Sequence, residues 1–286
     1  MTRILVATDF STRSDRAMRR ASLIAGKTGA SITLAHVVDA DRVDQLIDAD
    51  RTAASAVLAD TASTLRDIDG IAADWIVKVE DVHRGILQAG DEMSADLIVI
   101  GPHRSRMRDV FVGTTAERVV RQSTRPLLIA VEMPAAHHRK TLLALDFDNA
   151  SEAAAAKALT MGIFDSTEVV VMHAFDAPGA SMMRRAMENP QAIDQYVDAE
   201  GEQAAAKLRT LLDDLGLPPT CQTVVSMQGS PARTILESAQ NVGTDLIVMG
   251  TNQRKGFERA LIGSVTADVI RDAHRDILII PVDEGA

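Results

Sequence analysis

The chain has 286 residues, of which 46% are hydrophobic and 24% charged, and its net charge is −10. At roughly 100–200 residues per domain this length suggests two domains, and the apolar content excludes a disordered chain. The negative charge and the 3% aromatic content disfavour nucleic acid and anionic membranes as partners. One cysteine excludes internal disulfides and multi-cysteine metal sites, and no segment reaches the roughly 18 apolar residues of a membrane span. We therefore expect a soluble, cytoplasmic protein.

Apolar runs alternate with helical segments through the first half of the chain. The runs are continuously apolar, which is typical of parallel strands buried on both faces. The first helical segment begins at Ser11, a favoured capping residue, and ends at Gly29. The alternation predicts a doubly wound α/β sheet. The runs are residues 4–8, 31–38, 96–101 and 126–131, and the helical segments are 11–28, 52–66 and 83–94.

The second half of the chain repeats the first. The recurring segments, in the same order, are RILVATDFS at 3–11 and KTLLALDFD at 140–148, DLIVIG at 96–101 and DLIVMG at 245–250, Gly113-Thr114 and Gly263-Ser264, and PLLIAVE at 126–132 and ILIIPVD at 277–283. This shared order indicates a duplicated domain. We predict two doubly wound, Rossmann-like α/β domains in tandem, residues 1–134 and 139–286, related by a pseudo-twofold axis.

The last apolar run of each copy would form an exposed edge strand, which invites aggregation. A tandem chain can cover both edges internally. We therefore predict that strands 127–132 and 277–282 lie side by side and antiparallel, so that the two domains pair within one chain. A homodimer of two such chains stays open.

In an open parallel sheet, ligands bind at the carboxyl ends of the strands, where the strand order reverses. Asp9 and Asp146 follow the first strand of each copy. Gly263-Ser264 opens a helix, whose free N–H groups and dipole favour a phosphate. The Ser264 and Thr266 hydroxyls can add donors, while Asp146 can accept a hydrogen bond from a ribose or an adenine amino group. The alternative for both aspartates is that each caps the helix that follows it.

At these residues the chain resembles the universal stress protein family, as a tandem pair over essentially its whole length. ATP-binding members of that family carry G-x-x-G-x9-G-(S/T) after the fourth strand. The second copy reads GTNQRKGFERALIGSVT, with Gln253 in place of the middle glycine. Gly263 is expected to have positive φ and to leave room for phosphate. The resemblance implies a stress-response binding module for ATP or ADP, with Mg²⁺, held by Asp146, Ala174, Gly229, Gly250, Gln253, Gly263, Ser264, Val265 and Thr266.

The first copy departs further from the family pattern. Arg104 takes the place of the middle glycine, the spacing to the next glycine is one residue shorter, and Glu80 stands where the second copy has Gly229. With Arg106 and Arg108, Arg104 makes a basic loop that is either an anion site or a solvated surface loop. The first copy is therefore a degenerate nucleotide site, and nucleotide is predicted in the second.

Other functions stay open. Slow ATP hydrolysis needs charge neutralisation and a base; Arg254 and Lys255 can supply charge, but no base and no Walker-type motif is evident. A receiver-like phosphoacceptor needs an acidic pair and a lysine that the strand ends lack. A tandem scaffold without nucleotide is a further alternative. We expect a binding protein, with at most weak ATPase activity, and no metal site of its own.

Some further residues have less specific interpretations. His36 and His173 follow strands without other ligands at metal spacing, so packed histidines are expected. His137 and His138 lie in the linker and are expected to be exposed. Residues 177–198 hold a methionine-rich turn that is either an adaptable lid or partner surface, or a helix covering the core of its own domain.

Overall fold

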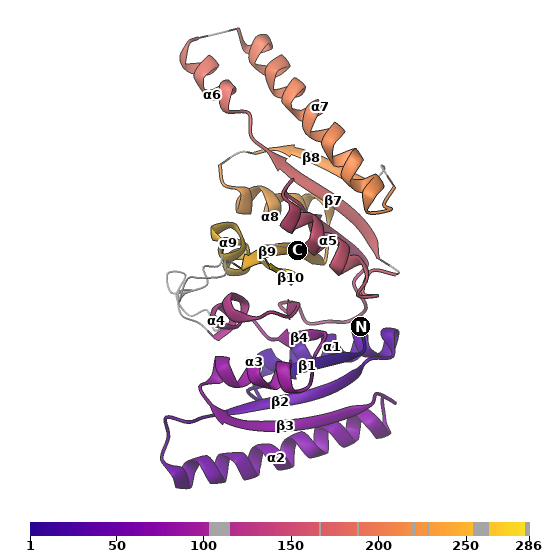
Figure 1. Cartoon of the computed structure of the whole chain (residues 1–286), viewed down its shortest axis with the longest axis vertical. Helices are drawn as coiled ribbons and strands as arrows, with labels where there is room; N and C mark the ends of the chain where they lie inside the picture. Colours follow the sequence, from indigo (N-terminus) through magenta and orange to yellow (C-terminus); the bar gives the residue numbers. More distant parts are fainter. Residues whose placement is uncertain are drawn as a thin grey trace.

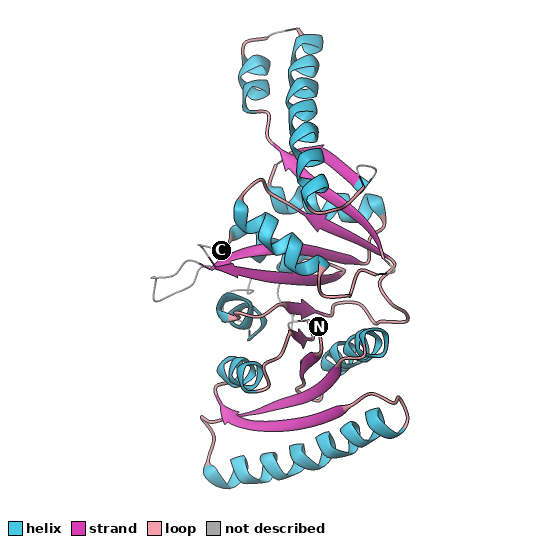
Figure 2. Ribbon diagram, turned by 45° about the vertical axis from the view of Figure 1, so that its right-hand side comes forward, coloured by secondary structure: helices cyan, strands magenta, loops and turns pink. Residues whose placement is uncertain are grey.

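The computed structural model describes residues 1–102, 115–165, 167–187, 189–218, 221–227, 229–253 and 263–283. Within them the strands form one continuous ten-stranded sheet with helices on both faces (Figure 1 and Figure 2). The first half comprises β1 (Arg3–Ala7), α1 (Thr12–Thr28), β2 (Ser31–Asp39), α2 (Asp44–Asp67), β3 (Ala73–Glu80), α3 (Val82–Glu92), β4 (Leu97–Ile100), α4 (Thr115–Gln122) and β5 (Leu127–Ile129). The second comprises β6 (Lys140–Ala144), α5 (Asn149–Leu159), β7 (Glu168–Phe175), α6 (Pro178–Arg185), α7 (Pro190–Asp214), β8 (Gln222–Ser226), α8 (Pro231–Val242), β9 (Leu246–Gln253), α9 (Ser264–Asp272) and β10 (Asp276–Asp283).

Each half has the strand order of a doubly wound domain. The order is β3-β2-β1-β4-β5 in the first half and, running on across the sheet, β10-β9-β6-β7-β8 in the second. The described strand pairs within each half are parallel. Parallel neighbours require crossover connections, which the helices supply. The predicted fold of two tandem Rossmann-like units is confirmed.

The two halves meet where β5 pairs with β10. The pairing is antiparallel, with Leu128 opposite Leu278 and Ile129 opposite Ile277, which confirms the predicted contact between the last strands. Both leucines enter the hydrophobic core that lies against α1, α2, α5 and α7. Both isoleucines enter the core against α3, α4, α8 and α9. Each core thus continues across this seam from one half into the other.

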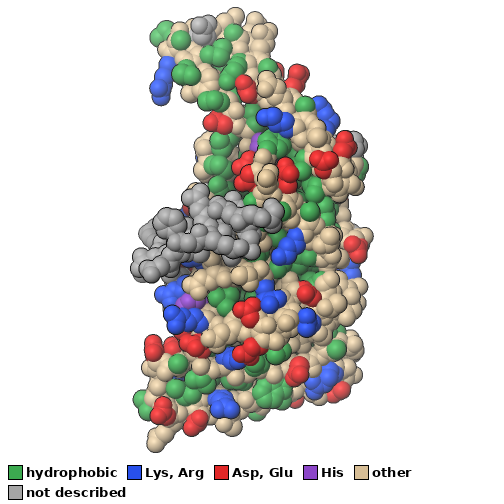
Figure 3. Space-filling view, in the orientation of Figure 1, with side chains coloured by type: hydrophobic (Ala, Val, Ile, Leu, Met, Phe, Trp, Pro, Cys, Tyr) green, Lys and Arg blue, Asp and Glu red, His purple; other side chains and the backbone are tan. Residues whose placement is uncertain are grey.

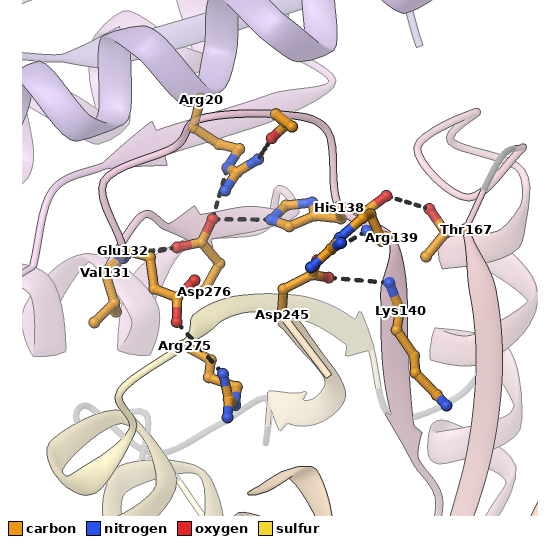
Figure 4. A network of polar contacts seen from close by, with 11 residues as sticks. Arg20, Val131, Glu132, His138, Arg139, Lys140, Thr167, Asp245, Arg275 and Asp276 are labelled. Carbon is orange, nitrogen blue, oxygen red and sulfur yellow. Dashed lines mark hydrogen bonds and ion pairs between the residues drawn. The ribbon is translucent and has the colours of Figure 1, made fainter. Parts of the chain in front are cut away.

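A buried carboxylate, Asp276 at the start of β10, ties the linker between the halves to the sheet (Figure 4). Its Oδ1 accepts hydrogen bonds from the Val131 and Glu132 N–H groups at 2.8 and 3.1 Å. Its Oδ2 accepts from Arg20 Nε at 2.7 Å and lies 2.9 Å from His138 Nε2. Burial alone would raise the pKa of Asp276, but the hydrogen bond from His138 and the charge of Arg20 lower it. The prediction that both linker histidines are exposed is wrong for His138, which is 5% exposed.

The first helix of each half is capped from a position close to the end of the preceding strand. Ser11 caps α1, which ends at Gly29 with φ +71°, as predicted. In the second half Asp148 caps α5. The capping alternative for Asp9 and Asp146 is therefore wrong, and both carboxylates lie outside the cap position.

The second half carries an extra helix between its second and third strands. The offset between equivalent residues rises from 137 at His36 and His173 to 149 at the helix caps Asp81 and Ser230. The added residues form α6 and its connections, and α6 packs against α7 beyond the edge of the sheet (Figure 1). The expectation of a helix that covers the domain core is wrong for α6.

Candidate functional site

A cavity of about 630 Å³ opens at the carboxyl ends of β6, β7 and β9, where the strand order of the second half reverses. This is the volume of an ordinary small-molecule site and the place where doubly wound sheets bind ligands. The first turn of α9 closes one side. The lining residues are Ala144, Leu145, Asp146, Asp148, Ala150, Ser151, Met172, His173, Ala174, Asp176, Met227, Pro231, Ile235, Met249, Gly250, Thr251, Gly263, Val265 and Thr266.

The structure brings most of the predicted site residues together around this cavity. Those that line it are Asp146, Ala174, Gly250, Gly263, Val265 and Thr266. Ser264 is the exposed first residue of α9, and Gly229 precedes α8; neither is among the lining residues. The backbone of Gln253 ends β9, but its side chain lies outside the described part of the structure, as do Arg254 and Lys255.

Asp146 lines the cavity, and its carboxylate has spare hydrogen-bonding capacity. Its Oδ1 accepts the Phe147 N–H at 2.8 Å, the one hydrogen bond to this carboxylate from the described residues. The Asp146 N–H donates to Ser151 Oγ at 2.9 Å, which fixes the backbone without using the carboxylate. Because an ionised carboxylate has about four acceptor positions, several remain for donors of a ligand.

The absence of a side chain at position 250 has a structural reason that the sequence pattern does not reveal. A Cβ there would lie 2.9 Å from Ala154 Cβ of α5, so the missing side chain lets the helix approach the strand. The equivalent Gly101 is more crowded, with Arg13 O 2.6 Å from the Cβ position. Each glycine thus serves the contact between its strand and the first helix of its half.

We expect Gly250→Ala to lower the free energy of unfolding by about 1–3 kcal/mol, because the added methyl group overpacks the contact with α5. The matched control is Gly26→Ala, since a Cβ at this helical glycine meets no atom of the described residues within 4 Å. That change should be neutral or stabilising by up to about 1 kcal/mol. Chemical denaturation of both variants measures the difference, and equal effects would contradict the packing explanation.

Gly263 and Gly229 differ in backbone conformation. Gly263 has φ −55° and ψ 140°, so the predicted positive φ is wrong. No heavy atom of the described residues lies within 4 Å of its Cβ position, and none of their side chains caps the N-terminus of α9. Gly229 has φ +93°, a conformation that favours glycine. In the first half, Glu80 stands at that position.

His173 forms part of the cavity wall, which sequence reasoning missed. Its Nδ1 lies 2.9 Å from Leu145 O, and its ring lies against Phe147 with centroids 3.9 Å apart. The packed histidine is as predicted. Beside it the wall is apolar, with Met172 and Met249 on the strands. The sequence feature that could have placed Met172 and His173 in the cavity wall is their position near the carboxyl end of a strand, β7.

The first half has an equivalent cavity of about 500 Å³ with different charged groups. Here Arg13 occupies the position of Ala150 and lies with its Nη2 3.6 Å from Asp9 Oδ2. The Ser11 N–H and hydroxyl also donate to the Asp9 carboxylate. Partial burial alone would raise the pKa of Asp9, but the Ser11 hydrogen bonds and the Arg13 charge lower it. The Asp9 carboxylate is therefore bound by neighbouring groups of its own half, whereas the Asp146 carboxylate keeps acceptor positions for a ligand. The loop of Arg104, Arg106 and Arg108 lies outside the described residues.

Two further features concern only the described residues. No group of three or more His, Cys, Asp and Glu among them is arranged to hold a metal ion. None of the described helices combines the length and the apolar content that crossing a bilayer requires.

The fold and the strand-end cavities define a tandem pair of doubly wound α/β domains, each with a cavity at its switch point. The model of the universal stress protein family matches residues 1–130 and 137–281. The chain therefore belongs to the universal stress protein family.

One curated relative matches half of the chain, and another matches nearly all of it. A universal stress protein of Methanocaldococcus jannaschii is 29% identical over 144 residues, covering 50% of this chain and 82% of its own length. One of Mycolicibacterium smegmatis is 24% identical over 294 residues, covering 97% of this chain and 96% of its own.

Solved structures share the tandem fold. A protein of unknown function from Pseudomonas aeruginosa has a TM-score of 0.72 at 21% identity, covering 99% of this chain and 94% of its own. A universal stress protein from Archaeoglobus fulgidus has a TM-score of 0.70 at 19% identity, covering 98% of each chain.

Proposed function

We propose that this protein binds an adenine nucleotide, ATP or ADP, in the cavity of its second half and acts through it as a regulatory module of the stress response. One observation carries the proposal: Asp146, whose carboxylate accepts one hydrogen bond from the described residues, and the first turn of α9, which no described side chain caps, line the same 630 Å³ cavity. A nucleotide has hydroxyl and amino donors for the first and phosphate acceptors for the second.

The polar groups suit the two ends of such a ligand. The first N–H groups of α9 follow Gly263, and no side chain of the described residues caps them, which suits a phosphate at this position. Asp146 lies across the cavity and can accept from a ribose hydroxyl or an adenine amino group. The apolar wall, which includes Met172, Ile235 and Met249, suits a base. Mg²⁺ would enter with the phosphates and offset their charge.

The first half supports the same assignment by contrast. The volumes of the two cavities do not distinguish them, because both are within the usual range for small-molecule sites. Their charged groups do. The Asp9 carboxylate is held by Ser11 and Arg13, whereas the Asp146 carboxylate accepts one hydrogen bond from the described residues. Glu80, which stands at the position of Gly229, is not among the residues that line the first cavity.

We expect Asp146→Ala to weaken ATP binding by about 1–3 kcal/mol, or roughly 5- to 150-fold, because the ligand loses a hydrogen bond to a charged acceptor. The fold should tolerate the change, since the Ser151 hydroxyl is bonded by the Asp146 backbone. Titration calorimetry with ATP and Mg²⁺ measures it, with Asp9→Ala as the matched control that keeps affinity unchanged. Equal weakening by both changes, or by neither, would refute the assignment.

A further inference from the structure

The extra helix α6 is held in a defined position by its own small core. A Cβ at Gly179 would lie 2.8 Å from Tyr196 Cζ, so the glycine lets the ring of α7 pack against α6. Ala180 of α6 and Ile193 of α7 are 4% and 6% exposed. α6 is thus fixed on the projecting half of α7, and the surface that it presents has a definite place.

That surface combines methionine and arginine side chains. Met182 is 65% exposed and Met187 is 93% exposed, and Arg184 and Arg185 between them are also exposed. Within the described residues neither arginine makes an ion pair. Figure 3 shows hydrophobic and basic side chains together at this end of the molecule. We call these four residues the basic patch.

The opposite end of the molecule carries a complementary surface. Val43 and Leu46, at the start of α2, are 67% and 56% exposed. Asp44 and Asp48 flank them, both exposed and one helical turn apart. Arg42 nearby pairs with Asp50. We call Val43, Asp44, Leu46 and Asp48 the acidic patch.

The two patches of one chain cannot meet. α2 lies along β3 and α7 contacts β8, and these are the two edge strands of the ten-stranded sheet (Figure 1). A contact between the patches must therefore join two molecules. Each chain carries both patches at opposite ends, on the same side in Figure 1, so two antiparallel copies can make the contact twice. Such a pair is a closed, isologous dimer.

We propose that the basic patch of one chain docks on the acidic patch of a second copy. The exposed methionines cover Val43 and Leu46, and the two arginines face Asp44 and Asp48. An apolar centre with a charged rim is the usual arrangement of a protein interface, and flexible methionine side chains adapt well to a partner surface. The complementary charges fix which surfaces pair.

The placement of charged and apolar groups, rather than the net charge, favours a second copy over a lipid surface. A chain with net charge −10 is repelled by an anionic bilayer, and the basic patch offers only two arginines against that repulsion. A second copy is negative overall as well, but it holds Asp44 and Asp48 at fixed positions beside the exposed Val43 and Leu46, so that both the arginines and the methionines of the basic patch meet matching groups.

Charge reversal tests the contact. We expect the unaltered chain to dimerise in sedimentation velocity at concentrations on the order of 100 μM, as small interfaces allow. Arg184→Glu with Arg185→Glu gives a chain with two acidic patches, and Asp44→Lys with Asp48→Lys gives one with two basic patches. Each variant alone should be monomeric, and their equimolar mixture should recover the dimer, because every contact is then complementary again.

The controls separate this proposal from loss of folding and from other partners. All four positions are exposed, so both variants should keep the circular dichroism spectrum and thermal midpoint of the unaltered chain. A monomeric unaltered chain, dimeric reversal variants, or a mixture that stays monomeric would each overturn the proposal. Flotation with phosphatidylserine vesicles that requires Arg184 and Arg185, without self-association, would overturn it in favour of a lipid surface.

Discussion

Asp276→Ala is expected to lower the free energy of unfolding by about 3–5 kcal/mol, because it leaves a buried cation without its partner. Arg20 is 3% exposed, and the Val131 and Glu132 N–H groups lose their acceptor at the same time. Chemical denaturation measures the loss. The matched control is Asp272→Ala, which removes a carboxylate that is 57% exposed beside Arg271 and should cost less than about 1 kcal/mol. Similar losses in both variants would contradict the role of the buried network.

The Asp276 carboxylate also makes the free energy of unfolding depend on pH. Because the pKa of Asp276 is lowered in the folded chain, its contribution to stability is fully present above its ordinary pKa of 3.8. The contribution is lost as the pH falls through the folded-state pKa. We expect the free energy of unfolding to decline below about pH 4 more steeply in the unaltered chain than in Asp276→Asn. Parallel declines would show that other carboxylates dominate.

Gly263→Val is expected to abolish nucleotide binding and leave the fold intact. With φ −55° and no heavy atom of the described residues within 4 Å of the Cβ position, that part of the structure accommodates a side chain there. The valine would instead occupy the space in front of the α9 N–H groups, where the proposed phosphate lies. Calorimetry should detect no ATP binding, a loss of more than about 100-fold. An unchanged thermal midpoint is the control, and retained affinity would place the phosphates elsewhere.

The pairing of the two halves could be predicted from the sequence because the apolar runs recur in order and leave two edges to be covered. The buried network at that seam could not. Asp276 stands at the position of Pro126 in the first copy, so comparison of the repeats gives it no counterpart. In the sequence, the one remaining indication of this network was an aspartate at the start of a long apolar strand. Its partner Arg20 lies 256 residues away in the chain.

The position of the candidate cavity at the strand ends could be predicted from the sequence, but the contacts of its individual residues could not. Asp9 and Asp146 occupy equivalent positions in the two copies, yet only Asp146 has a carboxylate that is free of an ion pair within the described residues. The substitution of Arg13 for Ala150 was visible in the sequence, but its effect on Asp9 depends on the geometry of the turn before α1. The sequence DLIVMG does not show whether Gly250 is needed for a phosphate or for the packing of a helix. The short distance from its Cβ position to Ala154 of α5 shows that packing requires a glycine there.

Native mass spectrometry of the freshly purified chain, with ATP and Mg²⁺ added, tests the proposed nucleotide site most directly. The expected result is one adenine nucleotide per chain in the unaltered protein and in Asp9→Ala, and none in Gly263→Val. Two nucleotides per chain, no nucleotide, or undiminished binding by Gly263→Val would contradict the assignment of a single site to the second half.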